Sequence, residues 1–158
     1  MTEPLSPAAE RFQILLREAG SAARVVQVAE SARSAAEAAA AIGCEVAQIA
    51  KSIVFRAEDD QPVLVIASGA NRVNEKKVAA ALGRKIGRAD ADYVRKSTGY
   101  AIGGVAPIGH AIEPHVFLDR DLSRHKSIWA AAGHPHAVFE TDAAELERLT
   151  GGIVVDVT

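Results

Sequence analysis

A lysine at the start of an apolar strand is the first residue of this sequence that could do chemistry. In KSIVF, the alternation of a strand puts Lys51, Ile53 and Phe55 on one face, and Ser52 and Val54 on the other. A lysine that begins an apolar face points its ammonium group toward a cavity or its rim. The alternative is a lysine at a strand end whose ammonium group reaches water. The pattern alone leaves both interpretations open.

A glycine-rich stretch, STGYAIGGVAPIGH over residues 97–110, is the second candidate. Glycine costs folding entropy, and it usually occurs where the backbone turns tightly or approaches something closely. Gly103 and Gly104 place flexible backbone before the rigid Pro107, and free N–H groups on such a loop can bind an anion or an oxyanion. The stretch matches neither the GxxxxGK[ST] phosphate loop nor the GxGxxG dinucleotide pattern. A corner or a bulge of a sheet is the alternative.

The histidines and the single cysteine are less specific signals. His134 and His136 flank a proline in a predicted turn, and an HxH pair can chelate a metal, but no third ligand stands at a fitting spacing. We therefore predict no metal site. His136 is expected either to line a pocket or to be a turn histidine in water. Cys44 is expected to be a small buried residue, and the sequence has neither a GxSxG elbow nor a Ser/His/Asp grouping.

The elements that must position these residues follow from capping residues and periodicity. Helices are expected over 8–19, 35–42, 74–83, 90–98 and 142–149, with Ser6, Ser34 and Thr141 as N-terminal caps. Strands are expected over 23–30, 51–57, 62–68, 85–89, 115–119, 127–133, 136–140 and 153–157, and a short helical turn over 45–50. Hairpins alternate with single helices. The order predicts an α/β (α+β) fold, with a mixed, mostly antiparallel sheet or closed barrel surrounded by helices.

Length and composition fit one domain that spans residues 1–158. Apolar residues make up 49% and charged residues 24%, an ordinary globular balance, and the aromatic share of 4% disfavours a stacking platform for single-stranded nucleic acid. A run of about 18 apolar residues and an apolar leader are both absent, so we expect no membrane partner. Cys44 alone excludes an internal disulfide. A cytoplasmic location fits these features.

Charge is distributed unevenly along the chain. The formal net charge is −2, but residues 51–96 carry ten Lys or Arg against six Asp or Glu, so this middle segment is positive while the rest is negative. A basic segment can meet a polyanion locally. The alternative is a solvated face with ordinary ion pairs.

Three segments together resemble the YbaK/EbsC family, the free-standing homologues of the prolyl-tRNA synthetase editing domain that include the ProXp deacylases. The resemblance runs from about residue 20 to the end of the chain. It is carried by GCEVAQIAKSIVF, VLVIASGANRVNEKKVAAALG and RADADYVRKSTGYAIGGVAPIGH. The most specific parts are the lysine of AKSIVF, the KKVAAALG helix and the pattern STGYxxGGxxPxG.

The resemblance implies a trans-editing deacylase that hydrolyses the ester of misacylated tRNA(Pro) without a cofactor, a metal or a covalent nucleophile. It implies that Lys51 helps to place the tRNA end, and that the loop from Gly103 to Pro107 holds the aminoacyl group through its backbone. The 2′-hydroxyl of the terminal ribose would help to activate water. Backbone N–H groups at Gly103 and Gly104 would stabilise the oxyanion. The implied partners are tRNA and prolyl-tRNA synthetase, and not DNA.

Further substrate contacts are predicted at Ser31, Arg33, Ser52, Val105, Ala106, Pro107 and His136. For Ser31 and Arg33, in AESARSAAEAA, the alternative is capping of the next helix. Ala106 stands where cysteine-directed members of the family typically have Ser, and AAAGHPHAVFE departs from their Ser-Gly-Gly and later Asp. Because an editing pocket selects mainly by excluding what is too large, the resemblance favours a small aliphatic residue, alanine or 2-aminobutyrate.

Two other classes of function stay open. A non-catalytic module that binds tRNA or a synthetase would keep the fold without the chemistry, and turnover separates it from a deacylase. A small-molecule binding domain unrelated to tRNA fits the net charge of −2. Salt-sensitive binding to tRNA would exclude that third class, because phosphate contacts release counterions.

Overall fold

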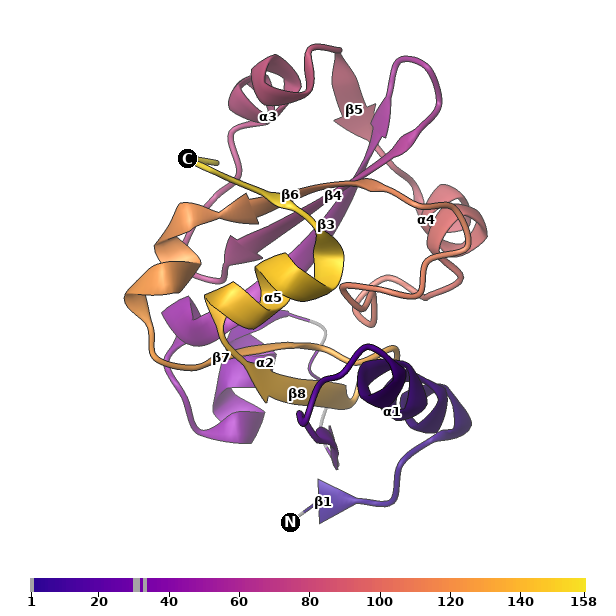
Figure 1. Cartoon of the computed structure of the whole chain (residues 1–158), viewed down its shortest axis with the longest axis vertical. Coiled ribbons are helices and arrows are strands. Elements are labelled where there is room, and N and C mark those ends of the chain that lie inside the picture. Colours follow the sequence, from indigo (N-terminus) through magenta and orange to yellow (C-terminus); the bar gives the residue numbers. More distant parts are fainter. Residues whose placement is uncertain (1, 30–31, 33) are drawn as a thin grey trace.

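The computed structural model describes residues 2–29, 32 and 34–158. Within these residues, nine strands pair into one sheet and five α-helices surround it (Figure 1). The strands are β1 (Thr2–Glu3), β2 (Val25–Val28), β3 (Ile49–Ala57), β4 (Pro62–Ser68), β5 (Ile86–Arg88), β6 (His115–Asp119), β7 (Ile128–Ala131), β8 (Ala137–Thr141) and β9 (Ile153–Val155). The α-helices are α1 (Pro7–Glu18), α2 (Ala35–Ile42), α3 (Glu75–Leu82), α4 (Ala91–Thr98) and α5 (Ala143–Thr150), and the 3-10 helices are η1 (Val46–Gln48) and η2 (Arg120–Arg124).

The sheet is mixed and mostly antiparallel, as the sequence predicts. Its order is β1-β2-β8-β7-β3-β4-β6-β9, and β5 pairs with β3 off this path. Five strand pairs are antiparallel, and the pairs β3–β7, β4–β6 and β6–β9 are parallel. Because β1 and β9 are the two ends of the order, the described strands form an open sheet and not a closed barrel.

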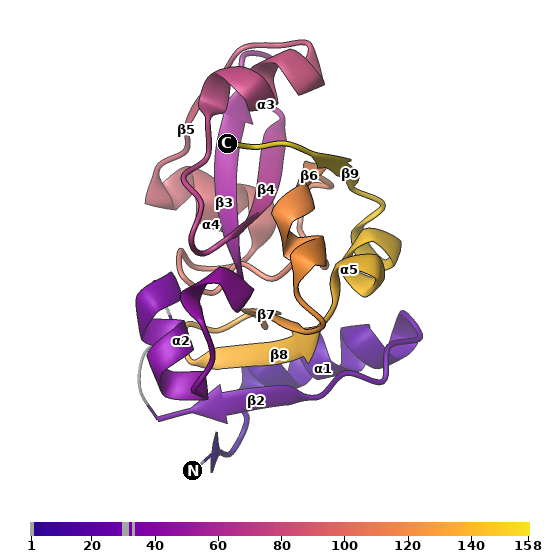
Figure 2. The ribbon, with the colours of Figure 1, turned by 90° about the vertical axis from the view of Figure 1, so that its left-hand side faces the viewer.

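The sheet changes direction between β3 and β7. Only two residue pairs join these strands, Ile49 with Trp129 and Ala50 with Ala130. Figure 2 shows the result: β2 and β8 run across the direction of β3 and β4, with α2 beside the junction. The N-terminal end of β3, which carries Lys51, therefore lies at the bend.

The hydrophobic core lies on both faces of β4, a strand that is completely buried. All seven residues of β4 are buried, which explains its continuous apolar run. Leu64 and Ile66 belong to a cluster that includes the face of α1, where the rings of Phe12 and Phe139 lie 5.3 Å apart. Val63 and Val65 point to a second cluster beneath α3. The fully buried strand β4 is thus a rigid support for β3, with which it pairs.

The helix ends confirm most of the predicted capping signals. Ser6 Oγ accepts a hydrogen bond from the N–H of Ala9, and Ser34 Oγ accepts one from Glu37. Thr141 was predicted to cap α5, and this is wrong: the cap is Asp142, which accepts from the N–H of Glu145. The hydroxyl of Thr141 donates to the Glu145 carboxylate instead. None of the described helices is long and apolar enough to cross a membrane.

One boundary near Lys51 differs from the sequence prediction. The 3-10 helix η1 ends at Gln48, and β3 begins at Ile49, two residues before the predicted start. The reason is the parallel pairing of Ile49 and Ala50 with β7. A pairing across 80 residues of sequence leaves no local signal, so the periodicity of EVAQIA indicated a helical turn.

Candidate functional site

Four of the predicted site residues line one pocket at the bend of the sheet. Lys51 and Ser52 come from β3, and Gly103 and Val105 from the glycine-rich loop. The pocket, which we call the Lys51 pocket, has a volume of about 140 Å³. The remaining wall is largely apolar and comes from α2, β7 and β8, through Ala35, Ala38, Trp129 and Val138. The structure thus brings together two segments about 50 residues apart in sequence.

Lys51 is held by a backbone carbonyl. Its Nζ donates a hydrogen bond to the carbonyl oxygen of Asn71 at 2.6 Å. Partial burial lowers the pKa of Lys51, and the negative charge of Asp119 opposes that shift. An ammonium group has three N–H donors, so two of them remain for a phosphate, a ribose or a carbonyl oxygen of a ligand.

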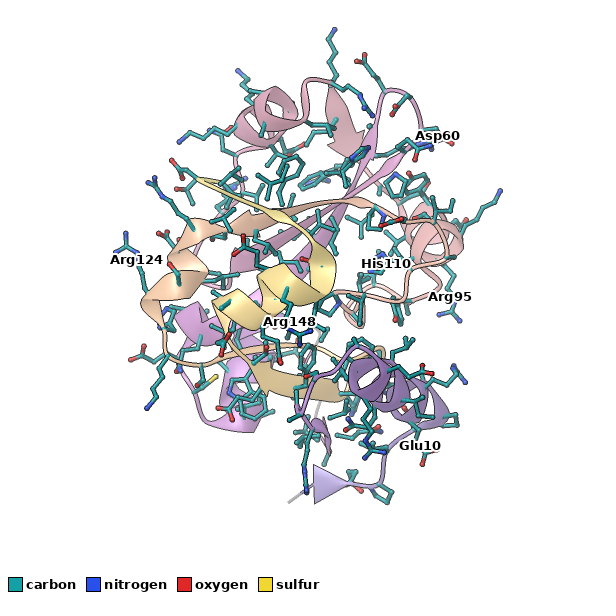
Figure 3. The ribbon with its side chains drawn as sticks, viewed as in Figure 1. Glu10, Asp60, Arg95, His110, Arg124 and Arg148 are labelled. Carbon is teal, nitrogen blue, oxygen red and sulfur yellow. The ribbon has the colours of Figure 1, made fainter. Side chains whose placement is uncertain are left out.

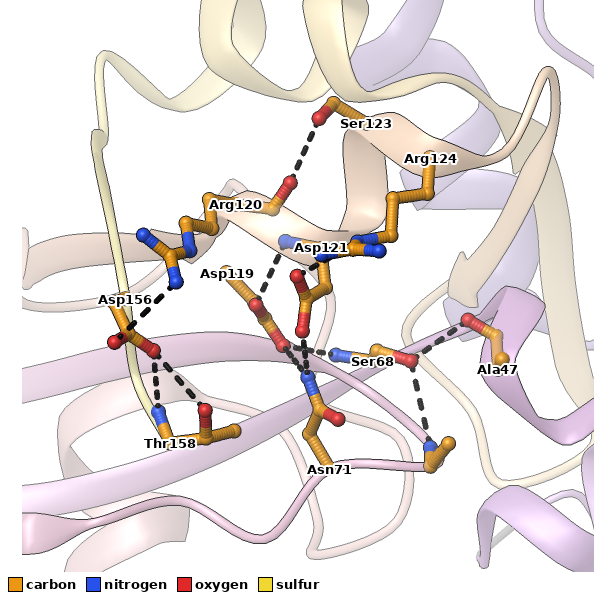
Figure 4. A network of polar contacts seen from close by, with 11 residues as sticks. Ala47, Ser68, Asn71, Asp119, Arg120, Asp121, Ser123, Arg124, Asp156 and Thr158 are labelled. Carbon is orange, nitrogen blue, oxygen red and sulfur yellow. Dashed lines mark hydrogen bonds and ion pairs between the residues drawn. The ribbon is translucent and has the colours of Figure 1, made fainter.

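Asn71, whose carbonyl oxygen Lys51 contacts, belongs to a network of polar contacts (Figure 4). The amide nitrogen of Asn71 donates to Asp119 Oδ2 and to Asp121 Oδ2, each at 2.8 Å. Asp119 is only 3% exposed, and its Oδ2 also accepts from the N–H of Ser68 at 3.0 Å. These bonds fix the turn that follows β4, and hence the carbonyl that Lys51 contacts.

The N–H groups of Gly103 and Gly104 in the glycine-rich loop differ in their hydrogen bonding. Gly103 has a φ of +89°, a left-handed conformation that favours glycine. The N–H of Gly104 donates to the carbonyl of Ala101 at 2.9 Å, so it is not available as the predicted oxyanion donor. Within the described residues, the N–H of Gly103 donates no hydrogen bond. Of the predicted pair, Gly103 is therefore the one that could serve an oxyanion.

Gly104 has a packing role instead. A Cβ at this position would lie 2.9 Å from the carbonyl carbon of His134 and 3.0 Å from the nitrogen of Pro135. The loop thus rests directly on the backbone of the turn between β7 and β8. Close approach of two backbone segments is a reason for glycine that the sequence pattern alone could not distinguish from ligand binding.

Ala106 and Pro107, at the end of the loop, do not line the Lys51 pocket. Ala106 is completely buried, and its carbonyl accepts from His110 Nε2 at 2.6 Å. Pro107 lines a separate pocket together with His110 and Leu149. The hydroxyl of Tyr100 donates to the carbonyl of Ile108 at 2.7 Å. These contacts hold the end of the loop in place.

The remaining predicted residues are placed as follows. His136 lies in the turn before β8, where its Nδ1 donates to the carbonyl of Val28 at 3.1 Å. Ser31 and Arg33 lie outside the described residues, although Ala32 and Ser34 line the Lys51 pocket. Over the described part of the chain, no group of three or more His, Cys, Asp or Glu side chains could hold a metal ion.

A second depression shares Lys51 with the first. It has a volume of about 450 Å³ and is lined by Arg72, Arg88, Glu75 and apolar residues of β3. Both arginines are exposed, and among the described residues neither forms an ion pair. Three cations against one carboxylate make this basic groove a surface for an anionic ligand. Lys51, Arg72 and Arg88 all belong to the positively charged segment 51–96, so part of its charge lies at the candidate site.

Sequence reasoning missed several residues of the site. Asn71 and Asp119 were not identified, although Asp119 ends one apolar strand and Asn71 lies in the connection that follows another. Trp129 and Ala38 line the pocket from β7 and α2, away from Lys51 in sequence. Their spacing from Lys51 carries no local signal that could have found them.

The comparisons with known proteins agree with this geometry. A profile of the aminoacyl-tRNA editing domain matches residues 29–149. A crystal structure provisionally described as a trans-editing enzyme for prolyl tRNA synthetase superposes with a TM-score of 0.92 at 42% identity, covering 98% of this chain and 99% of that one. The fold is therefore that of an editing domain.

Two bacterial relatives extend the match. The YwhH protein of Bacillus subtilis (strain 168) is 34% identical over 126 residues, 80% of each chain. EbsC of Enterococcus faecalis, provisionally named a Cys-tRNA(Pro)/Cys-tRNA(Cys) deacylase, is 28% identical over 129 residues, 81% of this chain and 77% of EbsC. The chain belongs to the aminoacyl-tRNA editing domain family of the YbaK/EbsC type, a family of aminoacyl-tRNA deacylases.

Proposed function

We propose that this protein is a trans-editing deacylase for tRNA(Pro) that carries a small aliphatic residue, alanine or 2-aminobutyrate. The observation that carries the proposal is the junction at Lys51, where a small, largely apolar pocket meets the basic groove. The pocket suits the side chain of the wrong amino acid. The groove suits the phosphates of the acceptor end.

The chemistry needs little from the protein beyond placement. An aminoacyl ester is already labile, so water attacks its carbonyl carbon and the ester bond to the ribose breaks through a tetrahedral intermediate. The N–H of Gly103 stabilises the oxyanion, a contribution of about 3–4 kcal/mol for one such donor in other hydrolases. The ribose 2′-hydroxyl assists the water, and Lys51 binds phosphate or ribose as a point charge. No metal takes part in this scheme.

Selection in this scheme rests on the pocket wall. Ala106, which suggested a pocket less polar than that of cysteine-directed relatives, is completely buried and does not line the pocket. The preference for a small residue is therefore supported by the pocket volume of about 140 Å³ and by its apolar lining from Ala35, Ala38, Ile49 and Trp129. One methylene changes such selection by only about 1–3 kcal/mol, so alanine and 2-aminobutyrate are both expected substrates.

The partners follow from the same surfaces. Arg72 and Arg88 support contact with tRNA phosphates beyond the terminal adenosine. The basic groove is lined by only three cations and the formal net charge is −2, so we propose that prolyl-tRNA synthetase helps to deliver the tRNA.

A panel of substrates tests the proposal. We would charge tRNA(Pro) in turn with alanine, 2-aminobutyrate, cysteine, serine and proline, and follow loss of the ester at matched salt with and without EDTA. Rapid loss of the alanyl and 2-aminobutyryl esters, with the prolyl ester spared and no effect of EDTA, is expected. Loss of cysteine alone would contradict the substrate assignment. Bound tRNA without turnover would indicate a non-catalytic module.

A further inference from the structure

We propose that Asp119, acting through Asn71, is a positioning residue that holds the Lys51 ammonium group at the mouth of the Lys51 pocket. The proposal rests on the proposed function for its activity measurement, and a second measurement does not need that function. Three structural steps lead to it.

The first step is the contact of Lys51 itself. A lysine side chain has four flexible carbons and loses much rotamer freedom when its ammonium group must occupy one place. The hydrogen bond to the carbonyl of Asn71, at 2.6 Å, supplies that restraint. A restraint of this kind works only if the carbonyl is itself fixed.

The second step is the anchoring of Asn71. Residues 69–74 connect β4 to α3, and a carbonyl in such a connection is free to reorient unless its residue is tied down. The side chain of Asn71 is tied to Asp119 and to Asp121 by two bonds of 2.8 Å. Asp119 Oδ2 also receives the N–H of Ser68, the last residue of β4. One buried carboxylate thus orients both ends of the turn.

The third step is the charge of Asp119. This carboxylate is 3% exposed, and in the described part of the chain no lysine or arginine forms an ion pair with it. Its hydrogen-bond donors are neutral groups of Ser68, Asn71 and Asp121. A buried charge without a cationic partner is costly, which points to a use beyond packing. Partial burial lowers the pKa of Lys51, and the negative charge of Asp119 opposes that shift.

Other charged groups lie near Lys51. Arg72, Glu75 and Arg88 line the same groove, and Asp121 in η2 accepts from the same Asn71 amide as Asp119. All of these are more exposed than Asp119, so water and salt screen their effect on Lys51 more strongly. Asp119 is therefore the group to change.

The test is a double-mutant cycle between Asp119→Asn and Lys51→Ala. Asp119→Asn keeps the side-chain shape, removes the charge and replaces one acceptor oxygen by an NH2 group that cannot accept from the surrounding N–H donors. We expect kcat/KM to fall on the order of 10-fold because the ammonium group is misplaced. In the Lys51→Ala background the same change should cost less than about twofold. Equal losses in both backgrounds would overturn the proposal, because they would show a general structural role.

A titration provides the independent measurement. NMR of the lysine side chains, with Lys51 assigned by its absence in Lys51→Ala, should show a lower pKa of Lys51 in Asp119→Asn than in the wild type. An unchanged titration would overturn the proposal even if activity fell. If the wild-type protein cleaves no ester but the titration shifts, the proposed function fails while the positioning role stands.

Two further variants keep the test decisive. Should Asp119→Asn fail to fold, Asn71→Ser removes the amide donor but keeps the backbone carbonyl, and it should lose activity only when Lys51 is present. Asp156→Asn, a carboxylate paired with Lys77 near the end of the chain, is the matched control and should leave the Lys51 titration unchanged. A shift of equal size in this control would contradict a specific role for Asp119.

Discussion

At the scale of single residues, the account depends on Lys51. A compact ammonium group with two N–H donors left over can bind phosphate or ribose without the planar fork of an arginine. Lys51 lies at the junction of the pocket and the basic groove. The strand-end lysine that merely reaches water is the weaker interpretation, because its Nζ is bonded to Asn71.

Replacing Lys51 should impair deacylation and spare the fold. For Lys51→Ala we expect kcat/KM to fall by about 10- to 100-fold, which corresponds to about 1.4–2.8 kcal/mol of transition-state stabilisation. Circular dichroism and the thermal midpoint should stay close to wild type. Lys126→Ala, which removes an exposed lysine elsewhere on the surface, is the matched control and should keep full activity. Full activity of Lys51→Ala would remove Lys51 from the site.

Through the partly buried His110, we expect the stability of the folded protein to depend on pH. Its Nε2 donates to the carbonyl of Ala106, which leaves Nδ1 buried without a hydrogen-bond partner among the described residues. Figure 3 places His110 inside the outline of the molecule, whereas Arg95 extends outward. Burial lowers the pKa of His110 below its ordinary value of 6.5, and the bond to Ala106 opposes this only in part.

The sign of the effect follows from the lowered pKa. Above about pH 6.5 the imidazole is neutral in both the folded and the unfolded chain, and its contribution to stability is fully present. As the pH falls below this value, the unfolded chain takes up the proton first, so stability is lost. The thermal midpoint should therefore fall by a few degrees between pH 7 and pH 5, and less so in His110→Gln. His125→Gln is the control, and an identical pH dependence in His110→Gln would contradict the assignment.

Several residues of the site could be predicted one at a time, but not the fact that they lie together in one pocket. Lys51, Ser52, Gly103 and Val105 were identified from local alternation and glycine content, and the structure brings them into one pocket. Asp119 was not, because its proximity to Lys51 arises from the parallel pairing of β4 and β6. Long-range pairing leaves no mark on local periodicity.

At the scale of elements, the glycine-rich loop is a packed turn that presents one face to the pocket. Gly104 meets the backbone of the turn between β7 and β8, and Tyr100 and His110 close the loop on itself. The loop is thus preorganised, which is what an oxyanion donor requires.

A methyl group at Gly104 should disturb this arrangement. Because its Cβ would lie about 3 Å from backbone atoms of His134 and Pro135, one of the two turns must shift. For Gly104→Ala we expect a lower thermal midpoint and a loss of activity of up to about 100-fold, the cost of a misplacement near 1 Å. Gly87→Ala in β5, where a Cβ meets no atom within 4 Å, should leave both unchanged. Unaltered rates in Gly104→Ala would show that the loop is structural only.

The helices were more predictable than the sheet. Caps at Ser6 and Ser34 and the left-handed glycines at 43, 83 and 151 are local signals, and they located these helices within a residue or two. The start of β3 and the two-residue β1 depend on partners far along the chain. The prediction of a single domain over residues 1–158 stays a prediction.

At the scale of the whole molecule, a protein of net charge −2 must bind a polyanion through a local surface. The basic groove is that surface in this account. Arg72 and Arg88 face it from opposite sides of β3, and Lys51 joins it to the pocket. Weak, salt-sensitive binding is the expected consequence.

The salt dependence of tRNA binding measures this contribution. We expect the slope of log K against log salt to decrease in magnitude by about 1 in Arg72→Ala and again in Arg88→Ala, because each arginine neutralises one phosphate. Arg17→Ala on α1 makes the same change of charge away from the groove and should leave the slope unchanged. Equal slopes in all three variants would place the tRNA elsewhere on the surface.

The central claim is that this protein hydrolyses the ester of a small wrong residue on tRNA(Pro) and spares the correct one. The most direct measurement is the first-order decay of alanyl-tRNA(Pro) and prolyl-tRNA(Pro), each with and without the protein, at one salt concentration. The account predicts that the protein accelerates loss of the alanyl ester well above its spontaneous rate, while the prolyl ester decays at its spontaneous rate. Spontaneous decay of both esters, with tRNA bound, would contradict it and indicate a module that binds tRNA without editing it.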